Sequence, residues 1–199
     1  MKYIDHYDKV LEKYNEAWHL ENHDRPVMNV TSWEQKTPVL KEPDSVEARW
    51  LDTDFVARKA RYIVENQHYS GESFPTVFTN LGPDLFAALY GAELKFGEST
   101  SWSEHCISEW KEGMRLTPDR NGKWYKKIIE LTEAMVEESK GDYVVGITDI
   151  HPGMDALVAM RGPQELCMDL YDCPELIKPL PMQLFEGFKQ LYDDLYRIV

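Results

Sequence analysis

The chain contains only three cysteines, and none of them belongs to a Cys-x-x-Cys pair that would indicate a metal-binding or redox motif. An odd number of cysteines without such spacing is typical of free thiols in a reducing compartment, so we expect a cytoplasmic protein. The sequence also lacks an apolar run of about 18 residues and a charged-then-apolar leader. We therefore expect neither a membrane protein nor a secreted one.

Positive charge is scarce as well. The chain has 22 lysines and arginines against 35 aspartates and glutamates, which gives a formal net charge of -13. Nucleic acids and anionic membrane surfaces are bound mainly through basic patches, so this balance argues against both as main partners. The expected partner is a small-molecule ligand.

Helical and strand patterns alternate along the chain, which contains no repeat and no linker. Apolar residues at three- and four-residue spacing predict several helices, and short β-branched or aromatic runs predict three strands. The expected helices cover residues 3–22, 53–67, 83–90, 102–115 and 121–139, two short helices within 153–176, and a last one containing Leu184, Phe188, Leu191 and Leu195. The expected strands are 27–31, 76–79 and 143–147. With 43% hydrophobic residues, the 199 residues are expected to form one domain, 1–199.

Three strands separated by helices indicate an α/β fold with parallel pairing through right-handed crossovers. A complete (β/α)8 barrel needs about 250 residues, more than the chain provides. We therefore expect a TIM-barrel-like architecture in the form of a partial barrel, with about three parallel strands and many helices.

The richest candidate site follows the third predicted strand, where Asp149, His151 and Asp155 lie within seven residues of one another. Loops at the carboxyl ends of parallel strands meet in one crevice, and a carboxylate beside an imidazole can transfer protons near neutral pH. We assign Asp149 and His151 a catalytic role and Asp155 a substrate-binding role. The alternative is a polar loop that caps the next helix.

Three further residues are candidates for substrate binding. Asn80 follows the second predicted strand, where its amide can bind a ligand or can form the turn before Gly82. Asn29 and Trp33 lie at the end of the first strand and can line a pocket or pack within a loop. His19 and His23 have a spacing that can present two imidazoles to zinc, but helix-end histidines more often meet backbone carbonyls, and no metal site is assigned.

Residues 141–176 resemble the uroporphyrinogen decarboxylase superfamily, which also includes the corrinoid and coenzyme M methyltransferases. The likeness lies in a hydrophobic strand, a loop containing His151-Pro152, an apolar helix that ends at Arg161-Gly162, and the run LCMDLYDCPEL. Arg25-Pro26-Val27, Leu81-Gly82 and the Tyr90–Glu93 segment are similar to its amino-terminal half. The resemblance implies a TIM barrel of which this chain is the first half, with a tetrapyrrole-like or a small carboxylated or methylated ligand at the strand carboxyl ends.

The chain departs from the superfamily at the residues that carry its best-known chemistry. It lacks the Arg-Gln-Ala-Gly loop after the first strand, it has Asn80 where the decarboxylases have an aspartate, and it has no His-x-Cys zinc pair. The resemblance therefore implies a corrinoid or zinc only in a completed barrel, as part of a corrinoid-dependent methyltransferase. The other alternative is a non-catalytic half-barrel that pairs with itself, as a homo-oligomer, or with a second chain.

Overall fold

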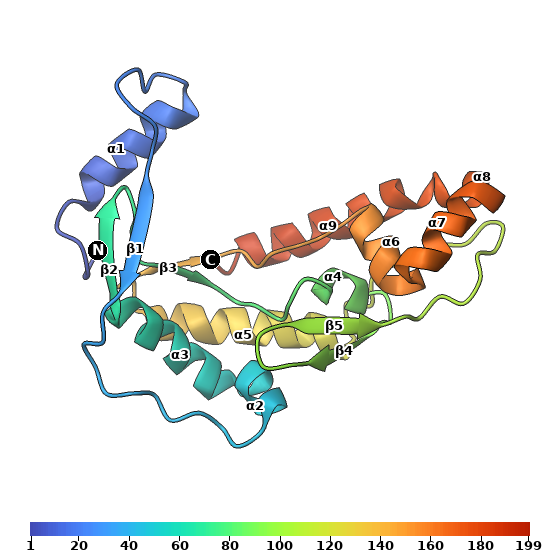
Figure 1. The fold of residues 1–199 in the computed structure, drawn as a ribbon, viewed down its shortest axis with the longest axis horizontal. Coiled ribbons are helices and arrows are strands. Elements are labelled where there is room, and N and C mark those ends of the chain that lie inside the picture. The colour runs from blue at the N-terminus through green and yellow to red at the C-terminus, as the bar shows by residue number, and fades with distance from the viewer.

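The computed structural model describes all 199 residues and shows an α/β protein with an elongated body and a projecting arm (Figure 1). The helices are α1 (Tyr7–Trp18), α2 (Val46–Leu51), α3 (Thr53–Glu65), α4 (Leu85–Ala88), α5 (Lys123–Ser139), α6 (Met154–Arg161), α7 (Pro163–Asp172), α8 (Pro174–Ile177) and α9 (Leu180–Tyr196). The strands are β1 (Asn29–Trp33), β2 (Gln67–Gly71), β3 (Thr76–Phe78), β4 (Glu93–Phe96), β5 (Ser101–Glu104) and β6 (Val144–Gly146). None of the helices has the length and apolar character needed to cross a bilayer.

The six strands form three separate two-stranded sheets. β3 and β6 are parallel, with Thr76 opposite Val144, and α5 lies in the connection between them. β4 and β5 form an antiparallel hairpin inserted before α5. β1 and β2 are antiparallel, with Asn29 opposite Gly71, and together with α1 they make up the arm.

The parallel pair β3–β6 is covered on one face only. Val145 on that face is buried against Ala60 and Val64 of α3 and Met135 of α5. On the other face Phe78 is 47% exposed, and each strand has one edge without a neighbouring strand. The sheet is therefore a two-layer element with an open face.

The largest core lies along the first part of α5, from Trp124 to Leu131, and joins α4, α6, α7 and α9 to it. Leu184, Leu191 and Leu195 form the fully buried stripe of α9 in this core. α9 approaches so closely that a Cβ atom at Gly187 would lie 1.9 Å from the Tyr90 hydroxyl. Only glycine fits at that position without a shift of the helix or the ring.

An ion pair holds the base of the arm. The guanidinium of Arg25 donates to the carboxylate of Glu72 at 2.8 Å, and the backbone N–H of Met28 donates to the same carboxylate at 2.9 Å. The Glu72 N–H donates in return to the Met28 carbonyl. These bonds join the entry of β1 to the exit of β2. The hydrogen bonds from Arg25 lower the pKa of Glu72 to about 2.

Most of the predicted elements are present. The helices predicted over 53–67 and 121–139 are α3 and α5, and the strands predicted over 76–79 and 143–147 are β3 and β6. The carboxyl-terminal helix begins within its prolines, because Pro179 and Pro181 occupy the first turn, where no N–H is needed. The Gly-Pro break at Gly162, with φ of 104°, separates α6 from α7 as expected.

Two predictions are wrong. The first strand does not join the parallel sheet, because β1 pairs antiparallel with β2, so two parallel strands are present rather than about three. The helix predicted over 102–115 is absent, and β5 followed by a loop takes its place. Ser101 and Ser103 turn inward there, and their hydroxyls donate to the carbonyls of Leu81 and Ala159. These hydrogen bonds satisfy the two buried hydroxyl groups, and the extended backbone of β5 directs both side chains inward to form them.

The structure shows no barrel. Its parallel sheet consists of the single pair β3–β6.

Candidate functional site

The loop after β6 brings Asp149, His151 and Asp155 together. Ile147 and Thr148 extend β6 into the body, and Gly153, with φ of 71°, turns the chain into α6. The Nε2 atom of His151 lies 2.7 Å from Oδ2 of Asp149, and its Nδ1 atom lies 3.7 Å from Oδ2 of Asp155. The imidazole thus has one carboxylate in hydrogen-bond contact and a second within ion-pair distance.

This geometry fixes how the imidazole can act. A carboxylate only accepts, so in neutral His151 the proton lies on Nε2 and the lone pair lies on Nδ1. Nδ1 makes no hydrogen bond within the protein and can accept a proton from a ligand. The arrangement can therefore serve as a general base or, once protonated, as a general acid.

Of the three side chains, only Asp155 has an evident structural role. Asp155 stands in the first turn of α6, where a carboxylate is favoured by the helix dipole. The Asp149 side chain is 60% exposed, so water screens its attraction to His151 and the pair adds little to stability. Exposure of this kind leaves both groups open to a ligand.

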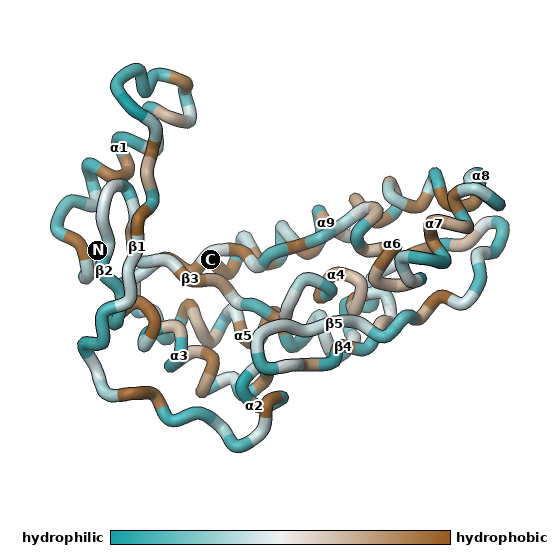
Figure 2. The backbone as a smooth tube through the Cα atoms, in the orientation of Figure 1, coloured by the Kyte–Doolittle hydropathy of each residue, from teal (hydrophilic) through white to brown (hydrophobic).

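An open groove of about 430 Å³ lies beside this loop and is called the aromatic groove below. Its walls come from β3, the 147–150 loop and α9. The lining residues are Phe78, Ile147, Thr148, Asp149, Ile150, Phe188 and Tyr192. Figure 2 shows hydrophobic residues at β3, whereas hydrophobic and hydrophilic residues alternate along the neighbouring α9. The groove therefore places aromatic walls beside Asp149, the carboxylate that contacts His151.

The aromatic walls were not identified from the sequence. The sequence pattern groups Phe188 with Leu184, Leu191 and Leu195 in the last helix, but Phe188 is only half-buried, and Tyr192 is 41% exposed. Their rings are 5.9 Å apart and tilted by 39°. A second stripe formed by Phe185, Phe188, Tyr192 and Tyr196 repeats at three- and four-residue spacing, and this spacing was the available signal.

Asn80 lies near the carboxyl end of β3 but lines a different cavity. Its Oδ1 atom accepts the N–H of Gly82 at 2.7 Å, which makes it a turn-forming residue. The cavity it lines, of about 560 Å³, lies between α3 and the free edge of β3 and also contains Arg49 and Lys59. Phe78 is the only residue common to both cavities. Asn80 is thus not brought into the aromatic groove.

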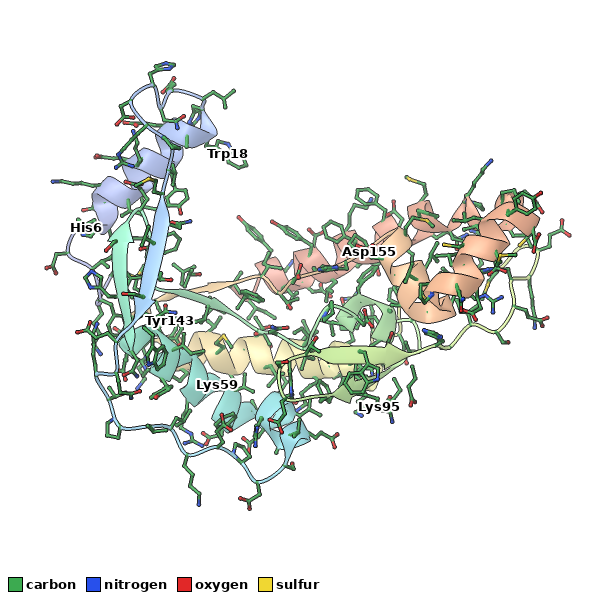
Figure 3. All side chains as sticks on the ribbon, viewed as in Figure 1. His6, Trp18, Lys59, Lys95, Tyr143 and Asp155 are labelled. Carbon is green, nitrogen blue, oxygen red and sulfur yellow. The ribbon has the colours of Figure 1, made fainter.

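Asn29 and Trp33 lie on β1 in the arm, away from the loop after β6 (Figure 1). Asn29 accepts a hydrogen bond from the Tyr14 hydroxyl at 2.7 Å, and the Trp33 ring packs 5.6 Å from that of Tyr62. Figure 3 shows Asp155 at the start of α6 and Trp18 at the far end of the arm, well apart. The two β1 residues therefore have local partners and do not join the acid–base loop.

The protein has no group of three or more histidines, cysteines, aspartates or glutamates placed to hold a metal ion. His19 Nδ1 lies 2.8 Å from the Asn15 carbonyl, a helix-end contact. All three cysteines are free; Cys106 and Cys167 are exposed and Cys173 is half-buried. The residues of this chain accordingly do not fit a zinc–thiolate centre.

No family model, no curated protein and no solved structure matches the chain.

Proposed function

We propose that the chain is the amino-terminal half of a TIM-type barrel of the uroporphyrinogen decarboxylase-like superfamily, and that the loop after β6 binds and protonates or deprotonates a small ligand. The observation that carries the proposal is the contact of His151 with two carboxylates at the carboxyl end of a parallel strand pair. In parallel α/β proteins, ligands bind at this end of the strands. The covered face formed by α3 and α5 supports the barrel, since helices cover one side of a barrel wall.

In this proposal His151 exchanges the proton through Nδ1, and Asp149 fixes the tautomer and the ring orientation. Asp155 stabilises the imidazolium form from 3.7 Å. Proton exchange of this kind is equally compatible with a decarboxylase and with a component of a methyltransferase. A corrinoid would supply the methyl-carrying chemistry only in a completed barrel, where the open face of β3–β6 would lie inside.

The test is an NMR titration of the chain, labelled with 13C at its histidine rings, with a tetrapyrrole, a small carboxylate and a methylated amine. The His151 ring signal should shift and saturate with at least one ligand class, and His151→Gln should remove that binding. His68 is the internal control, because it lies exposed on β2 in the arm. Equal responses of His68 and His151 to every ligand would refute the proposal.

A second function is favoured by one specific observation, the uncovered face and the two free edges of β3–β6. Strand edges with unpaired N–H and C=O groups are templates for pairing with another chain. In this alternative the chain is an assembly module that a second copy or another chain completes. Sedimentation velocity tests self-pairing: Phe78→Glu should lower the association, and Trp102→Glu, at an exposed site on β5, should not. A monomer at all concentrations would exclude self-pairing.

A further inference from the structure

The charges around the aromatic groove narrow the class of ligand. Asp149 is the only acidic or basic side chain that lines the groove, and neither a lysine nor an arginine is among its lining residues. Asp155 adds a second carboxylate next to His151. Two carboxylates against one imidazole leave the site negative in either protonation state of the histidine. A carboxylated ligand is therefore repelled, and a cation is attracted.

The nearest basic residue on α9 does not change this balance. The Lys189 ammonium lies 2.8 Å from the Glu186 carboxylate and 5.3 Å from the centre of the Phe185 ring. The positive charge of Lys189 is therefore paired with Glu186, one helical turn away from the groove. The chain as a whole carries a net charge of -13, which adds to the attraction for cations.

The walls of the groove favour one type of cation. Phe78 and Tyr192 are 47% and 41% exposed, and Phe188 contributes a third ring to the lining. Aromatic faces carry negative charge density and bind cations that are weakly hydrated. Quaternary and other methylated ammonium groups combine positive charge with apolar methyl groups, so they match rings and carboxylate together. A simple metal ion or a primary ammonium would keep its water shell in so open a groove.

We propose that the aromatic groove binds a methylated ammonium cation, with its nitrogen over the Phe188 and Tyr192 rings and beside the Asp149 carboxylate. This inference rests on the proposed ligand site after β6 and narrows its ligand class from carboxylated, methylated or tetrapyrrole-like molecules to methylated cations. It does not depend on completion of the barrel, because all lining residues belong to this chain.

The experiment uses choline and its uncharged isostere 3,3-dimethyl-1-butanol as probes on the full chain, with propionate as the anionic arm. Binding is followed by NMR through the ring signals of Phe78, Phe188 and Tyr192. Choline should produce saturable shifts at all three rings. The isostere should bind at least about threefold more weakly, since it lacks the charge that the rings and Asp149 attract. Propionate should give no shift at the rings.

Two variants and a matched control locate the binding. Asp149→Asn and Tyr192→Leu should each weaken choline binding about threefold or more. Tyr171→Leu is the control, because Tyr171 is an exposed tyrosine on α7 and does not line the groove. It should leave the affinity unchanged. All three side chains are exposed, so the circular dichroism spectrum of each variant should match that of the parent chain.

Equal binding of choline and its isostere would overturn the inference, as would choline shifts that Tyr192→Leu does not reduce. If propionate or a tetrapyrrole shifts the His151 ring while choline does not, the methylated cation is excluded and the proposed site after β6 stands. If no ligand shifts either the rings or His151, both proposals fail.

Discussion

The two faces of the β3–β6 pair are built from the same two strands but differ in burial and in the side chains that surround them. On the covered face Val145 packs with Ala60, Val64 and Met135, and each fully buried aliphatic side chain of this kind contributes about 1.5–3 kcal/mol. On the open face Phe78 remains half exposed, and the groove beside it is lined by two further aromatic rings, two isoleucines, a threonine and the Asp149 carboxylate. The covered face maintains the fold, and the open face is available for binding.

The difference shows why the candidate site lies where it does. Large apolar groups left in water on a monomer mark surfaces that bind a ligand or a partner. The acid–base loop borders the open face and not the covered one. Changes on the covered face should therefore affect stability, and changes on the open face should affect binding.

The largest expected effect comes from emptying the covered face. Met135 is 3% exposed, and Met135→Ala should lower the free energy of unfolding by about 2–5 kcal/mol because it leaves a cavity. Phe78→Ala on the open face should cost about 1 kcal/mol or less. Urea unfolding of both variants measures the comparison. Similar losses would mean that the open face is part of the core.

Asn66 holds the end of the covering helix α3. It is fully buried; its Oδ1 accepts the N–H groups of Lys36 and Thr37, and its Nδ2 donates to the Tyr62 carbonyl. Asn66→Ala leaves the N–H groups of Lys36 and Thr37 without their acceptor and should cost about 2–3 kcal/mol. Asn80→Ala, at an exposed asparagine with one turn bond, should cost less than about 1 kcal/mol. Chemical denaturation of the two variants measures the difference in their free energies of unfolding. A small loss of stability in Asn66→Ala would show that water replaces the hydrogen bonds of the amide.

The close approach at Gly187 tests whether α9 is a rigid wall of the open face. Gly187→Ala places a methyl group against the Tyr90 hydroxyl and should cost about 1–2 kcal/mol by overpacking. The Tyr90 hydroxyl is buried without a partner, so Tyr90→Phe should be nearly neutral. The double variant should recover part of the loss, which thermal unfolding of all four proteins would show. If the stability changes of the two single variants simply add up in the double variant, residues 187 and 90 are not in contact.

The smallest effect is expected at the arm, outside both faces. Because the pKa of Glu72 is lowered to about 2 from 4.5, its contribution is complete above pH 4.5 and is lost as the pH falls through about 2. Glu72→Gln should therefore destabilise the chain at pH 7, and the difference from the parent should shrink between pH 5 and pH 2. Urea midpoints across this range measure it. A constant difference would show that the carboxylate charge has no part in the clamp.

The sequence predicted those parts of the fold whose pattern is local. Leu131 and Met135 recur at helical spacing in α5, and Val145 lies in a β-branched run, so helix and strand followed directly. The sequence does not reveal β2, β4 and β5, because these strands are only four or five residues long and rich in polar residues. Ser101 and Ser103 are buried only because distant carbonyls accept their hydroxyls, and hydropathy does not register such partners.

The candidate site was predictable to the same extent. Asp149 and His151 are two residues apart, so their contact could be inferred from the chain alone. The groove beside them requires Phe78 of β3 and Tyr192 of α9 to meet from distant parts of the sequence, which no local pattern specifies. For the same reason the sequence could not show that Asn80 faces a different cavity.

Hydroxyl-radical footprinting with and without choline tests the central claim most directly, because it compares the two faces in one experiment. Without ligand, Phe78 and Tyr192 should be oxidised readily while Met135 is protected. Saturating choline should protect Phe78, Phe188 and Tyr192 and leave exposed aromatic residues elsewhere, such as Trp18 and Trp102, unchanged. Protection confined to the arm, or no change at the three groove residues, would contradict the assignment of the open face as the binding face.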